Sequence, residues 1–206
     1  MSATVTPLKV HAPLVQEDEA RAGYYALLAR LFYAGPDAQL LEAIAGSGEM
    51  VADGGQVAGA WNTLAAAARA MDAEAVRLEY DEVFVGTGKA EVTPYASFYL
   101  AETGRVKILV RLRQDLASLG LGKAGAAQEP EDHVAALFEV MRHLISQGSD
   151  DAALQKQRDF FNRYLERSFE PLCNAISNSD KANFYKRVGG FAKAFLVVET
   201  EGLKVF

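Results

Sequence analysis

The chain contains 206 residues with a mass of 22.3 kDa, and 50% of them are hydrophobic, which is typical of a globular protein and not of a disordered or fibrous one. Its formal net charge of −6 argues against nucleic-acid binding, which requires clustered Lys and Arg to neutralise phosphates. The single cysteine, Cys173, excludes an intrachain disulfide and a cysteine-based zinc site.

The length favours one domain, because single domains commonly reach about 200–250 residues. Residues 1–15 contain two prolines and no periodicity, so we predict a flexible lead-in there and a single all-helical domain over residues 16–206. No apolar stretch of signal-peptide length precedes Glu17, and no apolar run reaches the roughly 20 residues that span a bilayer. These features predict a cytoplasmic protein with no membrane span.

Helical patterns fill the first half of the predicted domain. From Glu17, apolar residues recur every three or four positions until Gly35-Pro36 ends the pattern. A shorter helix is predicted over residues 37–45, and an alanine-rich helix over residues 56–71. Asp72 is suited to cap a further helix. The apolar stripe of that helix consists of Val76, Tyr80, Val83 and Phe84.

A loop follows that helix. Gly86 permits a positive φ and Pro94 keeps the preceding residue out of helical geometry, so a loop of roughly ten residues is predicted here. Loops of this length within compact chains are often functional. Helical spacing returns over residues 105–119, and residues 120–128 form a second predicted loop.

The remainder of the chain is also helical in pattern. A helix is predicted to begin at Glu129, with Pro130 in its first turn. Another is predicted from Asp150, which Pro171 bends or divides, and a last one from Asp180. No convincing alternating strand segment occurs, so the predicted fold class is all-α, a bundle of roughly eight to ten helices.

Several motifs with known chemistry lack the context that they need. Residues 120–125 match the dinucleotide pattern G-x-G-x-x-G, but they follow a predicted helix in a chain without βαβ units, so we interpret them as a flexible loop. Gly88-Lys89 resembles the end of a phosphate-binding loop, yet Ala90 replaces the required Ser or Thr. Three histidines are too few for paired Glu-x-x-His metal motifs. We therefore predict no catalytic residue, no metal site and no cofactor, and interpret Cys173 as a buried structural residue.

Asp132 and His133 lie at the predicted start of a helix, directly after a loop. Two interpretations stay open: Asp132 stabilises the helix dipole while His133 lies half-buried beside the apolar stripe, or both residues take part in binding. Binding is favoured by the aromatic residues around the loop of residues 86–94, because one core face needs fewer of them. These aromatic residues are Tyr80, Phe84, Tyr95, Phe98 and Tyr99.

Two patterns combine these features. The first reads Tyr80-Asp81-Glu82-Val83-Phe84, Gly86 and Pro94-Tyr95-Ala96-Ser97, and the second reads Glu129-Pro130-Glu131-Asp132-His133. In order and spacing they resemble the two signatures of the TorD/DmsD/NarJ-like family of cytoplasmic maturation chaperones for molybdenum-containing redox enzymes. The Asp-His form resembles the TorD/DmsD branch more closely. Thr93 stands where many members carry proline and Tyr95 where tryptophan is frequent. The identity of the client enzyme is therefore left undecided.

The resemblance implies a TorD-like bundle that binds the twin-arginine signal peptide and the apo-molybdoenzyme catalytic subunit, assists cofactor insertion and delays export until folding is complete. A signal peptide presents an arginine pair and an apolar segment, so its site needs carboxylates beside an apolar groove. The candidate carboxylates are Glu79, Asp81, Glu82, Glu129, Glu131 and Asp132. We expect Asp132 to pair with a guanidinium, and His133 to donate a hydrogen bond that fixes the loop or the peptide.

The predicted signal-peptide-binding residues are Tyr80, Val83, Phe84, Gly86, Pro94, Tyr95, Ser97, Tyr99, Glu129, Pro130, Glu131, Asp132 and His133. The resemblance further implies a monomer or a domain-swapped homodimer, with residues 120–128 as a hinge, and weak binding of guanine nucleotide. Two alternative functions stay open. One is a non-catalytic helical adaptor, in which both motifs serve only capping and core packing, and the other is a nucleotide-binding enzyme.

Overall fold

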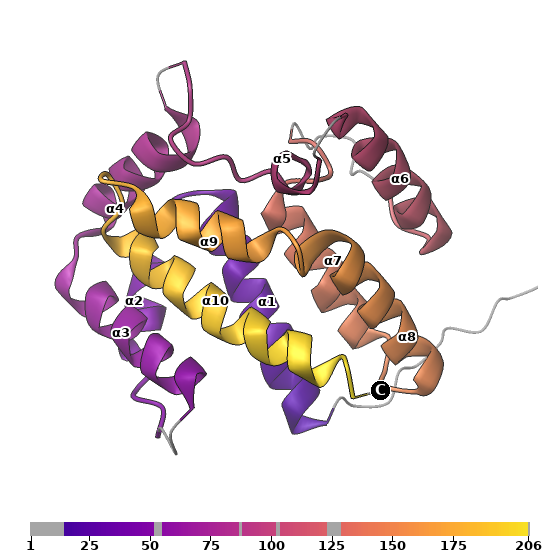
Figure 1. Cartoon of the computed structure of the whole chain (residues 1–206). Helices are drawn as coiled ribbons and strands as arrows, with labels where there is room; N and C mark the ends of the chain where they lie inside the picture. Colours follow the sequence, from indigo (N-terminus) through magenta and orange to yellow (C-terminus); the bar gives the residue numbers. More distant parts are fainter. Residues whose placement is uncertain (1–14, 52–54, 87, 102–103, 123–128, 206) are drawn as a thin grey trace, which may run out of the picture.

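Ten α-helices and two π-helical turns make up the part of the chain that the computed structural model describes, residues 15–51, 55–86, 88–101, 104–122 and 129–205. Figure 1 shows their arrangement. In chain order they are α1 (Gln16–Tyr33), α2 (Ala38–Gly46), α3 (Gln56–Ala70), α4 (Ala73–Tyr80), η1 (Asp81–Val85), α5 (Ala96–Leu100), α6 (Arg105–Ser118), α7 (Val134–Ser146), α8 (Asp151–Phe160), η2 (Phe161–Leu165), α9 (Phe169–Asn178) and α10 (Phe184–Gly202). The all-α prediction is confirmed for these residues, which contain no strand and one isolated bridge between Tyr95 and His133.

The core lies where helices from both ends of the chain meet. α1 packs along α7, while α10 packs against α3 and α9, and in Figure 1 α10 crosses in front of α1. The ring centroid of Tyr25 lies 4.9 Å from that of Phe195, and the centroid of Phe32 lies 5.9 Å from that of Phe138. All four side chains are buried, so α1, α7 and α10 share one aromatic core.

α6 stands apart from the other helices in Figure 1 and packs mainly on α5. Its inward side buries Leu112 and Leu116. Asp115 ties it to η2, because the Arg163 guanidinium and the Tyr164 hydroxyl each donate to this carboxylate at 2.5 Å. Burial would raise the pKa of Asp115, but the bonds from Tyr164 and Arg163 hold it below its usual value.

α2 and α4 each begin at a capping aspartate, of which Asp72 was predicted and Asp37 was not. The Asp37 carboxylate accepts a hydrogen bond from the Leu40 amide at 2.7 Å at the start of α2. The Asp72 carboxylate accepts from the amides of Glu74 and Ala75 at 2.9 and 3.2 Å at the start of α4. In both helices an acidic side chain supplies the acceptor that first-turn N–H groups lack within the helix.

The predicted start of the helix after residue 128 is wrong. α7 begins at Val134 and not at Glu129, and His133 is its N-cap. Residues 129–132 form a turn instead, in which the His133 amide donates to the Pro130 carbonyl at 3.1 Å. The start signals were placed one turn too early because Pro130 and the acids around it suit a turn as well as a helix.

Other boundaries also differ from the sequence patterns. The helix predicted from Asp150 is divided into α8, η2 and α9, and Pro171 lies in the first turn of α9, where its missing N–H has no intrahelical role. The last helix begins at Phe184 and not at Asp180, and the patterns did not indicate α5. Most of the predicted lead-in and hinge falls on residues 1–14 and 123–128, which lie outside the described residues.

A buried carboxylate from α4 starts the last helix. Glu79 accepts hydrogen bonds from the amides of Asn183, Phe184 and Tyr185 at 2.7, 3.0 and 2.8 Å. Such N–H groups at the first turn of α10 have no partner within the helix. Because this side chain is buried and fully used as a cap, Glu79 does not belong among the acids predicted to face a peptide.

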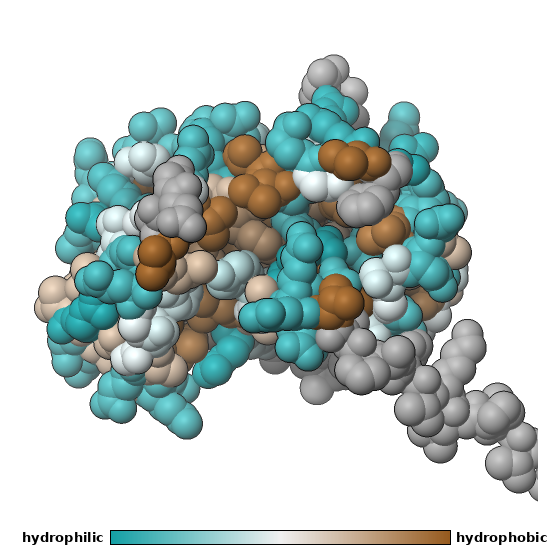
Figure 2. Space-filling model, turned by 90° about the horizontal axis from the view of Figure 1, so that it is seen from below, coloured by the Kyte–Doolittle hydropathy of each residue, from teal (hydrophilic) through white to brown (hydrophobic). Residues whose placement is uncertain are grey.

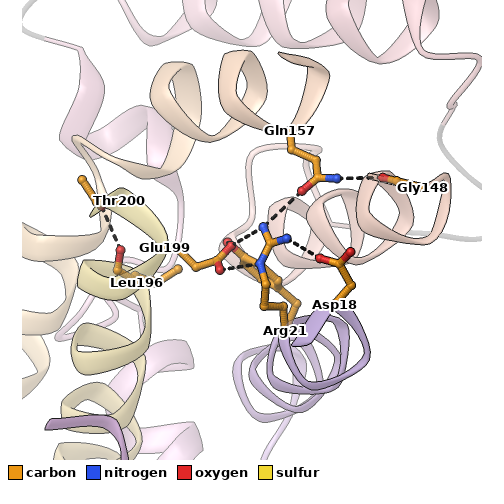
Figure 3. A network of polar contacts seen from close by, with 8 residues as sticks. Asp18, Arg21, Gly148, Gln157, Leu196, Glu199 and Thr200 are labelled. Atoms are coloured by element: carbon orange, nitrogen blue, oxygen red, sulfur yellow. Dashed lines mark hydrogen bonds and ion pairs between the residues drawn. The ribbon is translucent and has the colours of Figure 1, made fainter. Parts of the chain in front are cut away.

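A buried ionic network joins the first and last described helices (Figure 3). Arg21 of α1 donates to both carboxylate oxygens of Glu199 of α10 at 2.7 and 3.0 Å, and also to Asp18 at 2.7 Å and Gln157 at 3.1 Å. The Tyr25 hydroxyl adds a hydrogen bond to Glu199 at 3.0 Å. Burial would lower the pKa of Arg21, but the Glu199 and Asp18 carboxylates raise it above its usual value. The network therefore keeps its buried charges paired.

The described surface carries apolar side chains on several elements. Figure 2, which views the molecule from below Figure 1, shows apolar patches separated by polar side chains. Tyr33 at the end of α1, Phe98 in α5 and Val106 in α6 are examples of exposed large apolar residues. None of the described helices is both long enough and apolar enough to cross a membrane.

Candidate functional site

The two sequence patterns meet in space beside α7. The Val134 amide donates to the Pro94 carbonyl at 2.9 Å, and the Ala96 amide donates to the Asp132 carbonyl at 2.9 Å, which pairs Tyr95 with His133 in a short antiparallel bridge. The rings of Tyr95 and His133 pack edge to face with centroids 5.3 Å apart. Segments about 35 positions apart therefore form one structural unit.

Asp132 holds that unit together from inside. Its side chain is only 3% exposed, and its Oδ2 accepts a hydrogen bond from the Ser97 amide at 3.2 Å, in the first turn of α5. Because the residue is almost fully buried, its carboxylate is not open to a peptide guanidinium in this conformation. The structure thus gives Asp132 a positioning role, and it does not support the expected direct pairing of Asp132 with a guanidinium.

His133 caps α7 through its ring. Nδ1 accepts from the Ala135 amide at 3.2 Å, so the neutral ring carries its proton on Nε2. The side chain is 4% exposed, and this burial lowers the pKa of His133 although the Glu129 and Asp132 carboxylates act in the opposite direction. The imidazole is therefore neutral at pH 7 and offers one N–H donor.

A cavity of about 550 Å³ lies against this turn, between the end of α1, the end of α6 and most of the length of α7. Glu129, Pro130, Glu131 and His133 form one of its walls. Apolar side chains form most of the remainder. The residues that line the cavity are Ala29, Arg30, Tyr33, Leu116, Leu121, Gly122, Glu129, Pro130, Glu131, His133, Ala135, Ala136, Glu139, Val140, Arg142 and His143.

Three carboxylates lie at the rim of the cavity, and each has a partner. The Glu129 Oε2 atom accepts from the Tyr95 hydroxyl at 2.6 Å. Glu131 receives two bonds from Arg113, from Nε to Oε1 at 2.9 Å and from Nη2 to Oε2 at 3.1 Å. Glu139 pairs with Arg142 at 2.8 Å along α7. The lining also contains the arginines Arg30 and Arg142, so apolar side chains lie beside charged groups of both signs. Such a cavity is suited to a ligand that joins a charged group to an apolar segment.

Three aromatic or apolar residues of the first pattern, which were predicted to form a groove, do not line this cavity. Tyr80, Val83 and Phe84 are buried in the core. The Tyr80 hydroxyl donates to the carbonyls of Phe32 and Tyr33 at 3.1 and 2.8 Å, and burial, aided by Glu129, raises the pKa of Tyr80 to about 12. Their apolar character places them in the core, where they fix the end of α1 that forms a cavity wall.

The loop residues of the first pattern shape the chain between η1 and α5. Gly86 has φ +64°, and a Cβ atom there would lie 2.3 Å from the Lys89 carbonyl oxygen. Pro94 and Ser97 are buried, and the half-buried Tyr99 donates its hydroxyl to the Thr93 carbonyl at 2.9 Å. Burial raises the pKa of Tyr99 to about 12. These residues position Tyr95 and Asp132 and do not line the cavity themselves.

Several lining residues were not predicted. Ala136, Val140 and His143 lie one turn apart on α7, so helical spacing from His133 could have indicated them. Arg30 and Tyr33 come from α1, about 100 positions away, and no local signal points to them.

Other candidate chemistry finds little support among the described residues. Cys173 is buried, as predicted, and burial raises the pKa of its thiol to about 12. No group of three or more His, Cys, Asp or Glu residues within the described ranges is arranged to hold a metal ion. The G-x-G-x-x-G pattern begins after α6, and residues 123–125 of it lie outside the described residues.

A family model described as "Nitrate reductase delta subunit" matches residues 52–174. The chain belongs to this family. The matched residues include both sequence patterns and the turn that forms the cavity wall, so the family membership confirms the resemblance to TorD/DmsD/NarJ-like proteins.

Curated relatives of this family member are named "Chaperone protein TorD". The protein from Aliivibrio fischeri is 29% identical over 135 residues, which cover 61% of this chain and 62% of that protein, so the match spans about three fifths of the relative's length. The protein from Shewanella loihica is 23% identical over 202 residues, covering 90% of this chain and 94% of the relative. A redox enzyme maturation protein from Archaeoglobus fulgidus has a similar structure, with a TM-score of 0.54 at 18% identity over 94% of this chain and 99% of that one. At that identity the likeness concerns the fold alone.

Proposed function

We propose that this protein is a system-specific maturation chaperone. It binds the twin-arginine signal peptide and the apo form of a molybdenum-containing oxidoreductase in the cytoplasm, assists cofactor insertion and delays export until the enzyme has folded. Family membership and relatives named as TorD chaperones support this proposal. It assigns no catalytic step to the chain, which accords with a buried, protonated Cys173 and a neutral His133 that serves as a helix cap.

The observation that carries the proposal is the cavity beside the Glu129–His133 turn. A twin-arginine signal peptide joins guanidinium groups to an apolar segment, and the cavity joins rim carboxylates to an apolar interior. Its volume of about 550 Å³ falls in the range of ligand pockets, and it is large enough for several side chains. Glu129, Glu131 and Glu139 supply negative charge, and Leu116, Ala136 and Val140 supply apolar contact. Two arginines, Arg30 and Arg142, line the same cavity, so the carboxylates of the Glu129–His133 turn are the ones proposed to meet the peptide.

The pattern residues divide into three roles in this proposal. Glu129, Pro130, Glu131 and His133 contact the peptide, because they line the cavity. Asp132, Ser97 and Pro94 hold the turn in place through hydrogen bonds between the two patterns. Tyr80, Val83 and Phe84 act indirectly by packing the end of α1.

Calorimetry with twin-arginine signal peptides tests the proposal. Each peptide is titrated beside a version in which both arginines are lysines, since lysine keeps the charge but loses the planar fork that grips a carboxylate. We expect micromolar binding that the lysine pair weakens. Val140→Asp places a charge in the apolar interior and is expected to weaken binding at least about tenfold, a cost of roughly 1.4 kcal/mol.

Val197→Asp is the matched control, because Val197 is exposed on α10 and does not line the cavity. Equal losses in the two variants, compared at equal folded fraction, would place the peptide elsewhere. If no peptide binds, and if substitutions in the Glu129–His133 turn alter only stability, a role as a helical adaptor becomes the better explanation of this chain.

A further inference from the structure

The carboxylate of Glu131 already forms an ion pair with an arginine of the same chain. Arg113 of α6 forms a two-pronged pair with it, from Nε to Oε1 at 2.9 Å and from Nη2 to Oε2 at 3.1 Å. The Glu131 side chain is 15% exposed, whereas that of Arg113 is 59% exposed. The carboxylate is therefore largely buried, whereas the guanidinium that binds it is largely exposed to solvent.

This pair uses the same chemistry that the proposed peptide would use. A guanidinium and a carboxylate form two parallel hydrogen bonds whether the arginine belongs to the chain or to a ligand. A carboxylate that already accepts two parallel hydrogen bonds from one guanidinium cannot accept a second guanidinium in the same geometry. We propose that Arg113 is an internal competitor for Glu131, and that an arginine of the bound signal peptide displaces it. This inference rests on the proposed function, and it states that the contact between Arg113 and Glu131 regulates peptide binding at the cavity.

Because of the position of α6, this exchange of partners breaks few other contacts. Arg113 lies at the solvent-exposed side of a helix that packs mainly on α5. When the Arg113 guanidinium is released, the helix keeps its buried Leu112 and Leu116. It also keeps the hydrogen bonds that Asp115 accepts from Arg163 and Tyr164. Because Leu116 also lines the cavity, the same helix carries both the competing arginine and part of the apolar wall.

The strength of the competition follows from the exposure of the pair. Ion pairs at the protein surface are weak, so the closed fork is favoured over the open one by only a small factor. Arg113→Ala is therefore expected to tighten binding of a twin-arginine peptide by about two- to fivefold. Glu131→Gln removes the contested carboxylate and is expected to weaken binding, and Arg113→Ala added to it is expected to give no further gain.

Arg111→Ala is the matched control. It removes the same charge from the same helix two residues away, and Arg111 is not a partner of Glu131 in the fork. A general loss of repulsion between a cationic helix and a cationic peptide would affect both variants alike. Equal gains for Arg111→Ala and Arg113→Ala, weaker binding by Arg113→Ala, or unchanged binding by Glu131→Gln would each overturn the inference.

A second measurement separates this inference from the proposed function. In protein labelled with ¹⁵N at arginine, the Nε–H signal of Arg113, assigned through Arg113→Ala, is followed during addition of Arg-Arg amide or Lys-Lys amide. The inference expects Arg-Arg amide to move the signal toward its position in Glu131→Gln, at a concentration where Lys-Lys amide leaves it in place. Signal movement without binding of any signal peptide would refute the proposed function alone. Peptide binding with a stationary signal would refute the inference alone, and absence of both would refute both.

Discussion

Replacing Glu79 with alanine tests how the last helix is anchored to the rest of the fold. The substitution removes a buried carboxylate that accepts hydrogen bonds from the amides of Asn183, Phe184 and Tyr185. The bonds to Phe184 and Tyr185 are buried, so water does not readily replace the lost acceptor there. A buried donor without a partner costs about 1–3 kcal/mol, and two of them lead us to expect a loss of about 3 kcal/mol in the free energy of unfolding.

Urea unfolding followed by circular dichroism measures this loss, and in a chain of this size it corresponds to a decrease in Tm of about 6–12 °C. Glu79→Gln keeps one carbonyl acceptor and is expected to lose about half as much. Glu82→Ala is the control, because Glu82 is an exposed acid three positions along the chain, where changes are usually within about 0.5 kcal/mol. If Glu79→Ala lost less than about 1 kcal/mol, the capping argument would be refuted.

Three further predictions concern other residues. Gly86→Ala is expected to lower the free energy of unfolding by about 1–3 kcal/mol, because φ is positive and the new Cβ meets the Lys89 carbonyl; Gly88→Ala, which meets no atom within 4 Å, is expected to lose less in the same urea titration. Cys173 is expected to react with thiol reagents only as the chain unfolds, because burial raises its pKa to about 12 and keeps the thiol protonated; labelling faster than unfolding at pH 8 would contradict this. Burial lowers the pKa of His133 from 6.5, so below that pH the unfolded chain takes up a proton that the folded chain resists, and stability should fall as the pH drops. His133→Asn keeps a capping acceptor and should flatten that pH dependence between pH 7 and 5, and an unchanged slope would rule out His133 as its source.

Helices with an apolar stripe could be located from the sequence, because burial repeats every three or four residues whatever the partner is. The cap Asp72 could be predicted because it is a local feature, whose acceptor and donors lie within three residues of each other. The start of α7 could not, because residues 129–132 are fixed by hydrogen bonds to the distant chain around residue 95.

The candidate site was predictable to a similar extent. The two patterns indicated that residues around Tyr95 and His133 act together, and the structure brings them into contact. The same patterns placed Tyr80 and Phe84 on a groove, whereas both lie in the core. Aromatic residues serve either purpose equally well, and only the position of α1 decides between them. Glu79 shows the same difficulty, because its partners lie more than 100 positions away.

The network around Arg21 determines which parts of this chain can be separated from one another. Residues 52–174, which match the family model, include both patterns but neither α1 nor α10. A fragment limited to those residues would lose the buried pair of Arg21 and Glu199, and it would also expose Phe138, which packs on Tyr25. A short piece carrying the Glu129–His133 turn is therefore a poor reagent for binding studies. Fusion partners that strain α1 or the end of α10 are expected to weaken the site from a distance.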